Sequence, residues 1–144
     1  MPCPYFEPRR ALPALQPAKG RLPLIEEHEG LCRATAEPFE APAALRMRYC
    51  NHGYSRGACE HFPNTETRSA FRYHLTYLTE TELEITVIEE QDYAPAAWRI
   101  LKYSSEPERL EPEIEDCCMR AQVLALCHAY LNRFSAEAHA AFAT

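Results

Sequence analysis

The chain has 144 residues, of which 47% are hydrophobic and 25% charged, a composition typical of one globular domain with its own core. Its 15 basic and 21 acidic residues give a net charge of -6, and no basic stripe offsets that charge, so nucleic acid is not an expected partner. The first residues contain prolines where a signal peptide needs an apolar run, and no later apolar segment is long enough to span a membrane. We therefore expect a cytoplasmic protein without a membrane span.

We predict a single domain, residues 1–144, in which residues 1–66 form an irregular, proline-rich, cysteine-containing metal-binding arm that wraps a sheet-and-helix core, residues 67–144. Eight of the twelve prolines lie in the first 48 residues, where no helical or alternating pattern persists. Apolar side chains such as Phe6, Leu24 and Phe39 are spread through this segment and can anchor it on a core. Ordering such an arm loses conformational entropy, and a crosslink through a metal would offset part of that loss.

Alternation with a period of two predicts three strands between residues 68 and 105. Short polar breaks separate the three runs, which favours an antiparallel meander. Residues that share a face within each run are Phe71, Tyr73, Leu75 and Tyr77 in the first, Leu83, Ile85 and Val87 in the second, and Trp98 and Ile100, opposite Leu101 and Tyr103, in the third.

A period of three to four residues predicts a long C-terminal helix over about residues 112–134. Pro112 suits a first helical position, and the acidic residues around it favour a helix N-terminus. The predicted apolar stripe includes Cys117, Cys127 and His128 and should cover the sheet. We therefore predict an α+β fold: a three-stranded antiparallel meander packed against a long C-terminal helix, with an irregular proline-rich N-terminal arm.

The seven cysteines fall into two groups. Cys117, Cys118 and Cys127 lie in the helical pattern and are predicted to be core thiols, because adjacent helical side chains diverge by about 100° and cannot share one metal. The other four lie in the first 60 residues, where clustered thiols in a chain without an export signal more often bind metal than form disulfides. They are Cys3, Cys32, Cys50 and Cys59.

The stretch between Cys50 and Cys59 has the features of a ligand loop. Gly53 and Gly57 allow the backbone to bend tightly and turn amides inward, as negatively charged cluster sulfur requires. Aromatic residues flank three of the four thiols and would limit solvent access to a bound group.

The spacing of these cysteines favours an iron–sulfur cluster over zinc. Structural zinc sites take their ligands in close pairs, whereas here 28, 17 and eight residues intervene. We therefore predict one [4Fe-4S] cluster held by Cys3, Cys32, Cys50 and Cys59. The alternatives are a structural zinc in a non-enzymatic interaction module, or no metal. A second zinc set would consist of Cys50, His52, Cys59 and His61.

Other chemistries have little support in the sequence. There is no phosphate-binding loop, no dinucleotide fingerprint and no serine nucleophile elbow, although a cysteine nucleophile paired with His52, His61 or His74 remains an alternative. A cluster with four protein ligands fits electron transfer better than catalysis. The predicted function is an electron carrier or accessory redox subunit, in which acidic charge favours docking on a basic redox partner protein or larger oxidoreductase complex. The excess of arginine over lysine is typical of a bacterial genome rich in GC.

Overall fold

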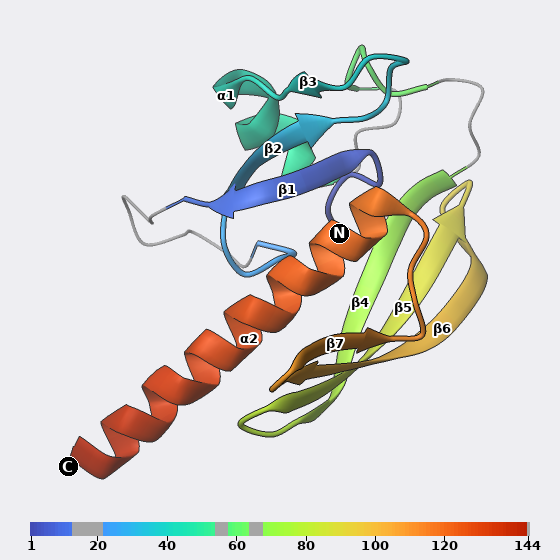
Figure 1. The fold of residues 1–144 in the computed structure, drawn as a ribbon. Coiled ribbons are helices and arrows are strands. Elements are labelled where there is room, and N and C mark those ends of the chain that lie inside the picture. The colour runs from blue at the N-terminus through green and yellow to red at the C-terminus, as the bar shows by residue number, and fades with distance from the viewer. Residues whose placement is uncertain (13–21, 54–57, 64–67, 144) are drawn as a thin grey trace.

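The chain folds into two antiparallel sheets and one long C-terminal helix, so its class is α+β (Figure 1). A computed structural model describes residues 1–12, 22–53, 58–63 and 68–143. The smaller sheet is built from the N-terminal segment and the larger one from the middle of the chain. The helix packs its side chains against both sheets.

The N-terminal segment is more regular than predicted. It contains a sheet with the order β1-β2-β3, followed by α1 and the π-helical turn η1. The bounds are β1 (Phe6–Ala11), β2 (His28–Cys32), β3 (Phe39–Glu40), α1 (Ala43–Leu45) and η1 (Arg46–Cys50). Pro8 made β1 look irregular in the sequence. Proline is tolerated there because β1 is an edge strand and its register shifts between Pro8 and Arg10.

The predicted meander is confirmed, and a fourth strand extends it. The larger sheet has the order β4-β5-β6-β7, with β4 (Arg68–Leu78), β5 (Glu82–Gln91), β6 (Ala94–Ser105) and β7 (Glu108–Glu111). The sequence pattern predicts no strand at β7, and the predicted helix starts directly after it. Pro112 therefore follows a strand and is not the first residue of a helix.

The predicted alternation of buried and exposed faces holds for β5 as far as Val87 and for β6 only from Leu101 onwards, because residues 94–100 are all exposed. Leu101 and Tyr103 are buried, while Trp98 on the opposite face is 71% exposed. The expectation for Tyr77 is wrong, because the register of β4 against β5 shifts between Leu75 and Tyr77 and the latter side chain is exposed.

The helix α2 (Cys117–Ala143) begins later than predicted, because Asp116 caps it. The Asp116 Oδ1 atom accepts a hydrogen bond of 2.9 Å from the backbone N–H of Met119 and so satisfies one of the free amides of the first turn. The buried stripe is also rotated from the predicted one, because His128 is exposed whereas Gln122 is fully buried. The helix therefore buries side chains towards both sheets.

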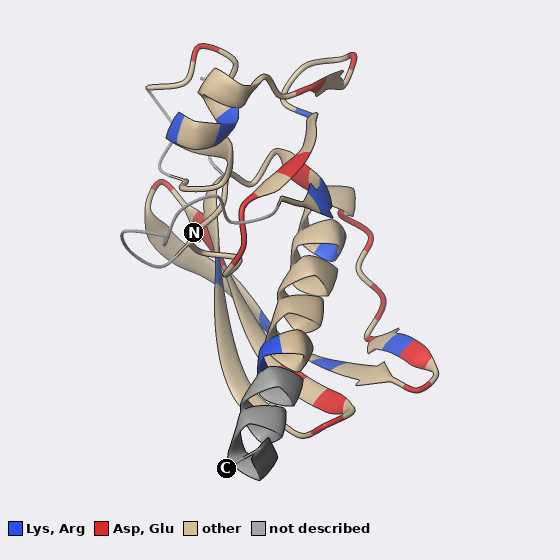
Figure 2. Ribbon diagram, turned by 90° about the vertical axis from the view of Figure 1, so that its left-hand side faces the viewer, with Lys and Arg blue, Asp and Glu red and all other residues tan. Residues whose placement is uncertain are grey.

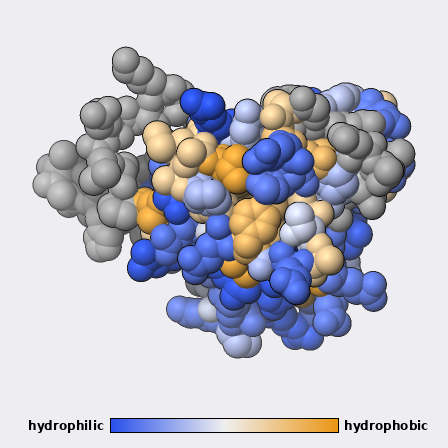
Figure 3. Space-filling view, turned by 90° about the horizontal axis from the view of Figure 1, so that it is seen from above, coloured by the Kyte–Doolittle hydropathy of each residue, from blue (hydrophilic) through white to orange (hydrophobic). Residues whose placement is uncertain are grey.

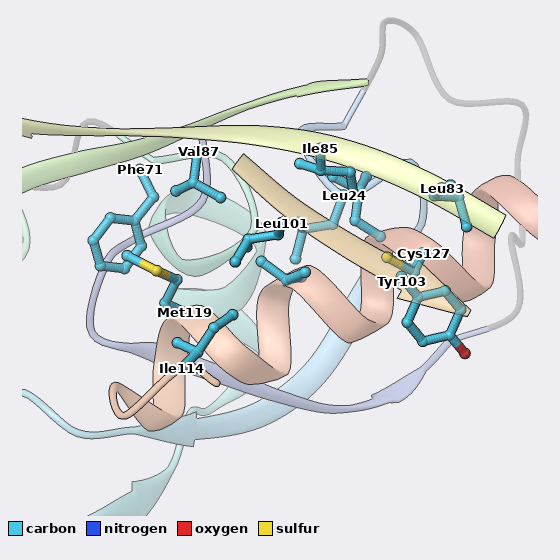
Figure 4. Close-up of a cluster of buried hydrophobic side chains, with 12 residues drawn as sticks. Leu24, Phe71, Leu83, Ile85, Val87, Leu101, Tyr103, Ile114, Met119 and Cys127 are labelled. Atoms are coloured by element: carbon cyan, nitrogen blue, oxygen red, sulfur yellow. The ribbon is translucent and has the colours of Figure 1, made fainter. Parts of the chain in front are cut away.

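The main core lies between α2 and the larger sheet (Figure 4). Side chains of β4, β5 and β6 meet Met119, Val123, Leu126 and Cys127 of the helix, and Leu24 from the N-terminal segment packs among them. A second cluster under the smaller sheet contains Cys3, Phe6, Ala41, Cys50 and Phe62. Within the described residues, no helix is long and apolar enough to cross a membrane.

The three helical cysteines differ in burial, and this leads to a stability prediction. Cys118 and Cys127 are buried as predicted, but Cys117 is exposed at the start of α2, so its assignment to the core is wrong. Burial, and to a smaller extent the charge of Glu108, raises the pKa of Cys127 to about 12, which makes this thiol unreactive.

Replacing Cys127 by alanine is expected to lower the free energy of unfolding by about 1 kcal/mol, through the loss of a small buried group. Cys117→Ala is the matched control and should change that free energy by less than about 0.5 kcal/mol. Urea unfolding of both variants measures the difference. Equal losses in the two variants would contradict the burial pattern of α2.

Candidate metal centre

Four cysteines from four separate segments line one pocket. Cys3 lies just before β1, Cys32 ends β2, Cys50 ends η1, and Cys59 lies in the segment 58–63. The cavity between them is about 20 Å³. Its other lining residues are apolar or aromatic, apart from one histidine: Tyr5, Phe6, Ala34, Leu45, Tyr49, His61 and Phe62.

Backbone pairing explains how three of these distant cysteines meet. The backbone N–H of Cys3 donates a hydrogen bond of 3.1 Å to the carbonyl oxygen of Cys50. Cys32 lies opposite Phe6 in the β1–β2 ladder. The start of the chain is therefore held between η1 and β2, with its thiol beside those of Cys32 and Cys50.

Aromatic packing places the fourth thiol. The backbone N–H of Phe62 donates a hydrogen bond of 3.1 Å to the carbonyl oxygen of Cys59 and closes a turn around this residue. The rings of Phe62 and Tyr5 meet edge to face with their centroids 5.2 Å apart. Because Tyr5 follows Cys3 closely in the chain, this contact brings the turn that carries Cys59 to the other three cysteines.

The thiols influence one another electrostatically. Burial raises the pKa of Cys50 to about 12, with further contributions from Cys3, Cys32 and Cys59. Burial also raises the pKa of Cys32, opposed by a hydrogen bond from the backbone of Ala34 and assisted by Cys59. A bound cation reverses this preference, because its charge stabilises the thiolate form of each ligand.

Burial divides the four thiols into two pairs. Cys3 and Cys50 are 9% and 7% exposed, whereas Cys32 and Cys59 are half-buried. A group bound by all four would be closed off on one side and nearer to solvent on the other.

Asn51 is a site residue that sequence analysis missed. Its side chain is buried, accepts a hydrogen bond from the backbone N–H of His28 and donates one to the carbonyl oxygen of the same residue, both at 2.9 Å. These bonds fix the end of η1 to β2 and thereby hold Cys50 near Cys32. Its position directly after Cys50 was the one sign in the sequence that Asn51 could support the site. The sequence alone does not show that its side chain is buried.

Gly53 is needed for the approach of the N-terminus to this site. Its φ is +84°, and a Cβ atom at this position would overlap the carbonyl oxygen of Met1. The predicted tight bend is therefore found at Gly53, while Gly57 lies outside the described residues. The close approach lets the segment before Cys3 pass over the end of η1.

Only one of the predicted histidines reaches the pocket. His61 lines it and packs on Phe39 with ring centroids 4.9 Å apart. His52 is exposed and does not line the pocket, and His74 is exposed on β4. The alternative zinc set of Cys50, His52, Cys59 and His61 is therefore not assembled around this cavity.

The donor set fits a metal group in its chemistry, but the side chains need to reorient. Four thiols with apolar and aromatic neighbours match the ligands of an iron–sulfur cluster or of a structural zinc. As the side chains stand, no three His, Cys, Asp or Glu residues of the described segments form a group that could hold a metal ion. Cys32 and Cys59 are half-buried, so a change of rotamer would cost these two side chains less buried apolar area than it would cost Cys3 and Cys50.

No protein-family model matches the sequence, and no curated protein and no solved structure is significantly similar to the chain. The fold and pocket together define an α+β protein with a four-thiol pocket.

His28, which Asn51 fixes through its backbone, gives a prediction for pH dependence. Burial lowers the pKa of His28, although its hydrogen bond to the Glu26 carbonyl and the Glu26 charge oppose the effect. The unfolded chain therefore binds the proton more readily, and stability is lost as the pH falls through about 6.5.

We expect the free energy of unfolding to fall by up to about 1 kcal/mol between pH 7 and pH 5.5. In His28→Gln this fall should become smaller, whereas the exposed His52→Gln should retain it. Urea unfolding at several pH values measures the free energy of unfolding of each variant. An unchanged pH profile in His28→Gln would show that other groups cause the acid sensitivity.

Proposed function

We propose that this chain is a small iron–sulfur protein, an electron carrier or accessory redox subunit that holds one [4Fe-4S] cluster. The ligands would be Cys3, Cys32, Cys50 and Cys59. The observation that carries the proposal is the convergence of these four thiols, from four separate segments, on one pocket. When bound, the cluster supplies one-electron chemistry.

The surroundings of the pocket suit an electron-transfer group. Tyr5, Phe6 and Phe62 provide a largely apolar wall, and such walls limit solvent access and tune a cluster's reduction potential. Four thiolate ligands leave no iron position open to a substrate, which favours electron transfer over catalysis.

The half-buried side of the site suggests where electrons would pass. Cys32 and Cys59 are the more exposed thiols, so a partner is expected to approach on their side. Seen from the end of the molecule with α1 and β3, apolar surface is exposed among hydrophilic side chains (Figure 3). Acidic residues are spread over several loops and strand ends (Figure 2), and the net charge of -6 favours a cytoplasmic partner with a basic docking surface.

A structural zinc is the second candidate, and the size of the cavity favours it. A volume of about 20 Å³ suits one water-sized body or a single ion better than a cubane cluster. The zinc would fasten the N-terminal segment to η1 and β2, and the protein would then be a non-enzymatic interaction module.

Anaerobic purification distinguishes the two candidates. An iron–sulfur protein is expected to be brown, to contain about four irons and four sulfides per chain, and to lose visible absorption on reduction with dithionite. A colourless protein with about one zinc per chain would support the second candidate. A protein with neither metal after reconstitution with iron and sulfide, or with zinc, would contradict both.

A further inference from the structure

Gln122 is a fully buried polar residue that connects the four-cysteine pocket with the core of the larger sheet. It lies on α2 and has an exposed fraction of 0%. Its Nε2 atom donates hydrogen bonds to the carbonyl oxygens of Cys3 and Phe6, both 2.8 Å long. Its Oε1 atom accepts a hydrogen bond of 2.7 Å from the hydroxyl of Tyr73 on β4.

These bonds fix the turn that presents the first thiol. The backbone N–H of Phe6 donates to the carbonyl oxygen of Cys3 at 3.0 Å, so a tight turn joins these two residues. Both carbonyl groups of this turn point to the same Gln122 amide. On the other side, the N–H of Cys3 is bonded to Cys50. The backbone of Cys3 is thus held from two directions, by η1 and by α2.

The two carbonyl oxygens determine which way the amide faces. They can only accept hydrogen bonds, so the NH₂ group of Gln122 points to them and its Oε1 atom faces Tyr73, whose hydroxyl donates to it. An apolar or acidic side chain of the same size could not donate to either carbonyl. The three bonds therefore need glutamine itself.

We propose that Gln122 is a positioning residue of the four-cysteine centre, which holds Cys3 in place for a bound metal group and couples the centre to α2 and β4. The inference rests on the proposed function, because it requires that the thiols bind metal. Partners that orient a metal ligand through hydrogen bonds typically contribute a factor of about 10 to 100 in metal affinity.

The test compares variants of the full-length protein reconstituted anaerobically with iron and sulfide. Gln122→Met keeps the size of the side chain and removes all three hydrogen bonds, so iron release to an excess of a ferrous chelator should become about 10 to 100 times faster. Tyr73→Phe removes the hydrogen bond to Oε1 and leaves both bonds from Nε2 to the carbonyl oxygens, so it should accelerate release by a smaller factor. This second variant keeps the test valid if the first fails to fold.

Val123→Ala is the matched control for general loss of stability. Val123 is the next residue of α2, is 0% exposed and packs in the main core instead of against Cys3. This variant should unfold more easily and still release iron at the wild-type rate under native conditions. Faster release in Gln122→Met and Tyr73→Phe, with the control unchanged, supports the proposal.

The possible failures can be told apart. If wild-type protein binds iron but Gln122→Met or Tyr73→Phe releases it no faster than Val123→Ala, Gln122 does not position the centre, although the proposed function stands. If wild-type protein takes up no iron after reconstitution, the iron–sulfur proposal fails together with this inference.

Discussion

Under the proposed function, replacing Cys50 by serine is expected to reduce bound iron from about four atoms per chain to less than one. Cys50 is buried, its carbonyl group is bonded to Cys3, and the other three thiols surround it, so serine would remove a ligand from the closed side of the pocket. A cluster with one thiolate missing is labile, and the loss should also loosen the N-terminal segment. Iron and sulfide analysis after anaerobic purification measures the effect.

The matched control is Cys117→Ser. It makes the same chemical change at an exposed thiol outside the pocket, and its iron content should equal that of the wild type. Cys59→Ser should behave like Cys50→Ser. Equal metal content in all three variants would exclude the pocket as the metal centre, and loss only in Cys117→Ser would mean that a different thiol group binds it.

Replacing Gly53 by alanine is expected to lower the free energy of unfolding by about 2–4 kcal/mol. Alanine at a φ of +84° costs about 1–2 kcal/mol, and the added Cβ atom must also displace the backbone of Met1. Because Met1 and Cys3 belong to the same short segment, this displacement should move the first thiol away from the others. Chemical unfolding and iron analysis of the variant measure both effects.

His52→Ala is the control for this prediction. His52 precedes Gly53 in the chain and is exposed, so its removal should change stability by less than about 0.5 kcal/mol and leave the iron content unchanged. If Gly53→Ala were as stable as this control, the described path of the N-terminus over η1 would be wrong.

The sequence predicts the larger sheet well and the smaller one poorly, for a physical reason. β4, β5 and β6 are long, pair with their sequence neighbours and bury one face, so a period of two is visible in each. In contrast, β1 contains a proline and a register shift, β3 has only two residues, and β1 and β2 are separated by 16 residues. Local periodicity cannot show such a sheet.

The helix α2 shows a second reason why the sequence alone does not predict the packing fully. Its existence follows from the apolar spacing, but its buried faces depend on two sheets that pack against it from different directions. A single apolar stripe predicts His128 at its edge, where the ring does contact Tyr103 and bond to Glu108, but it gives no role to the buried Gln122. The Asp116 cap and the strand β7 before it also moved the helix start beyond Pro112.

For the candidate site, the sequence indicates which residues could act as ligands, but it does not predict how they are arranged. The four N-terminal cysteines could be grouped because they lie apart from the helical ones, and the structure places them around one pocket. Their role as ligands stays a prediction. Asn51 and Gln122 could not be identified, because the hydrogen bonds that give them their roles join residues 23 and up to 119 positions apart.

The bond between Gln122 and Cys3 has a consequence for the order of events during synthesis. All four pocket cysteines leave the ribosome before Gln122 does, so a nascent chain can expose these four thiols while the residue that holds Cys3 is still missing. Under the proposed function, stable binding of a cluster would then have to wait until translation has passed α2. A ribosome-bound chain stalled upstream of this helix and supplied with iron and sulfide should then exchange iron rapidly with the medium, whereas the released protein should retain it.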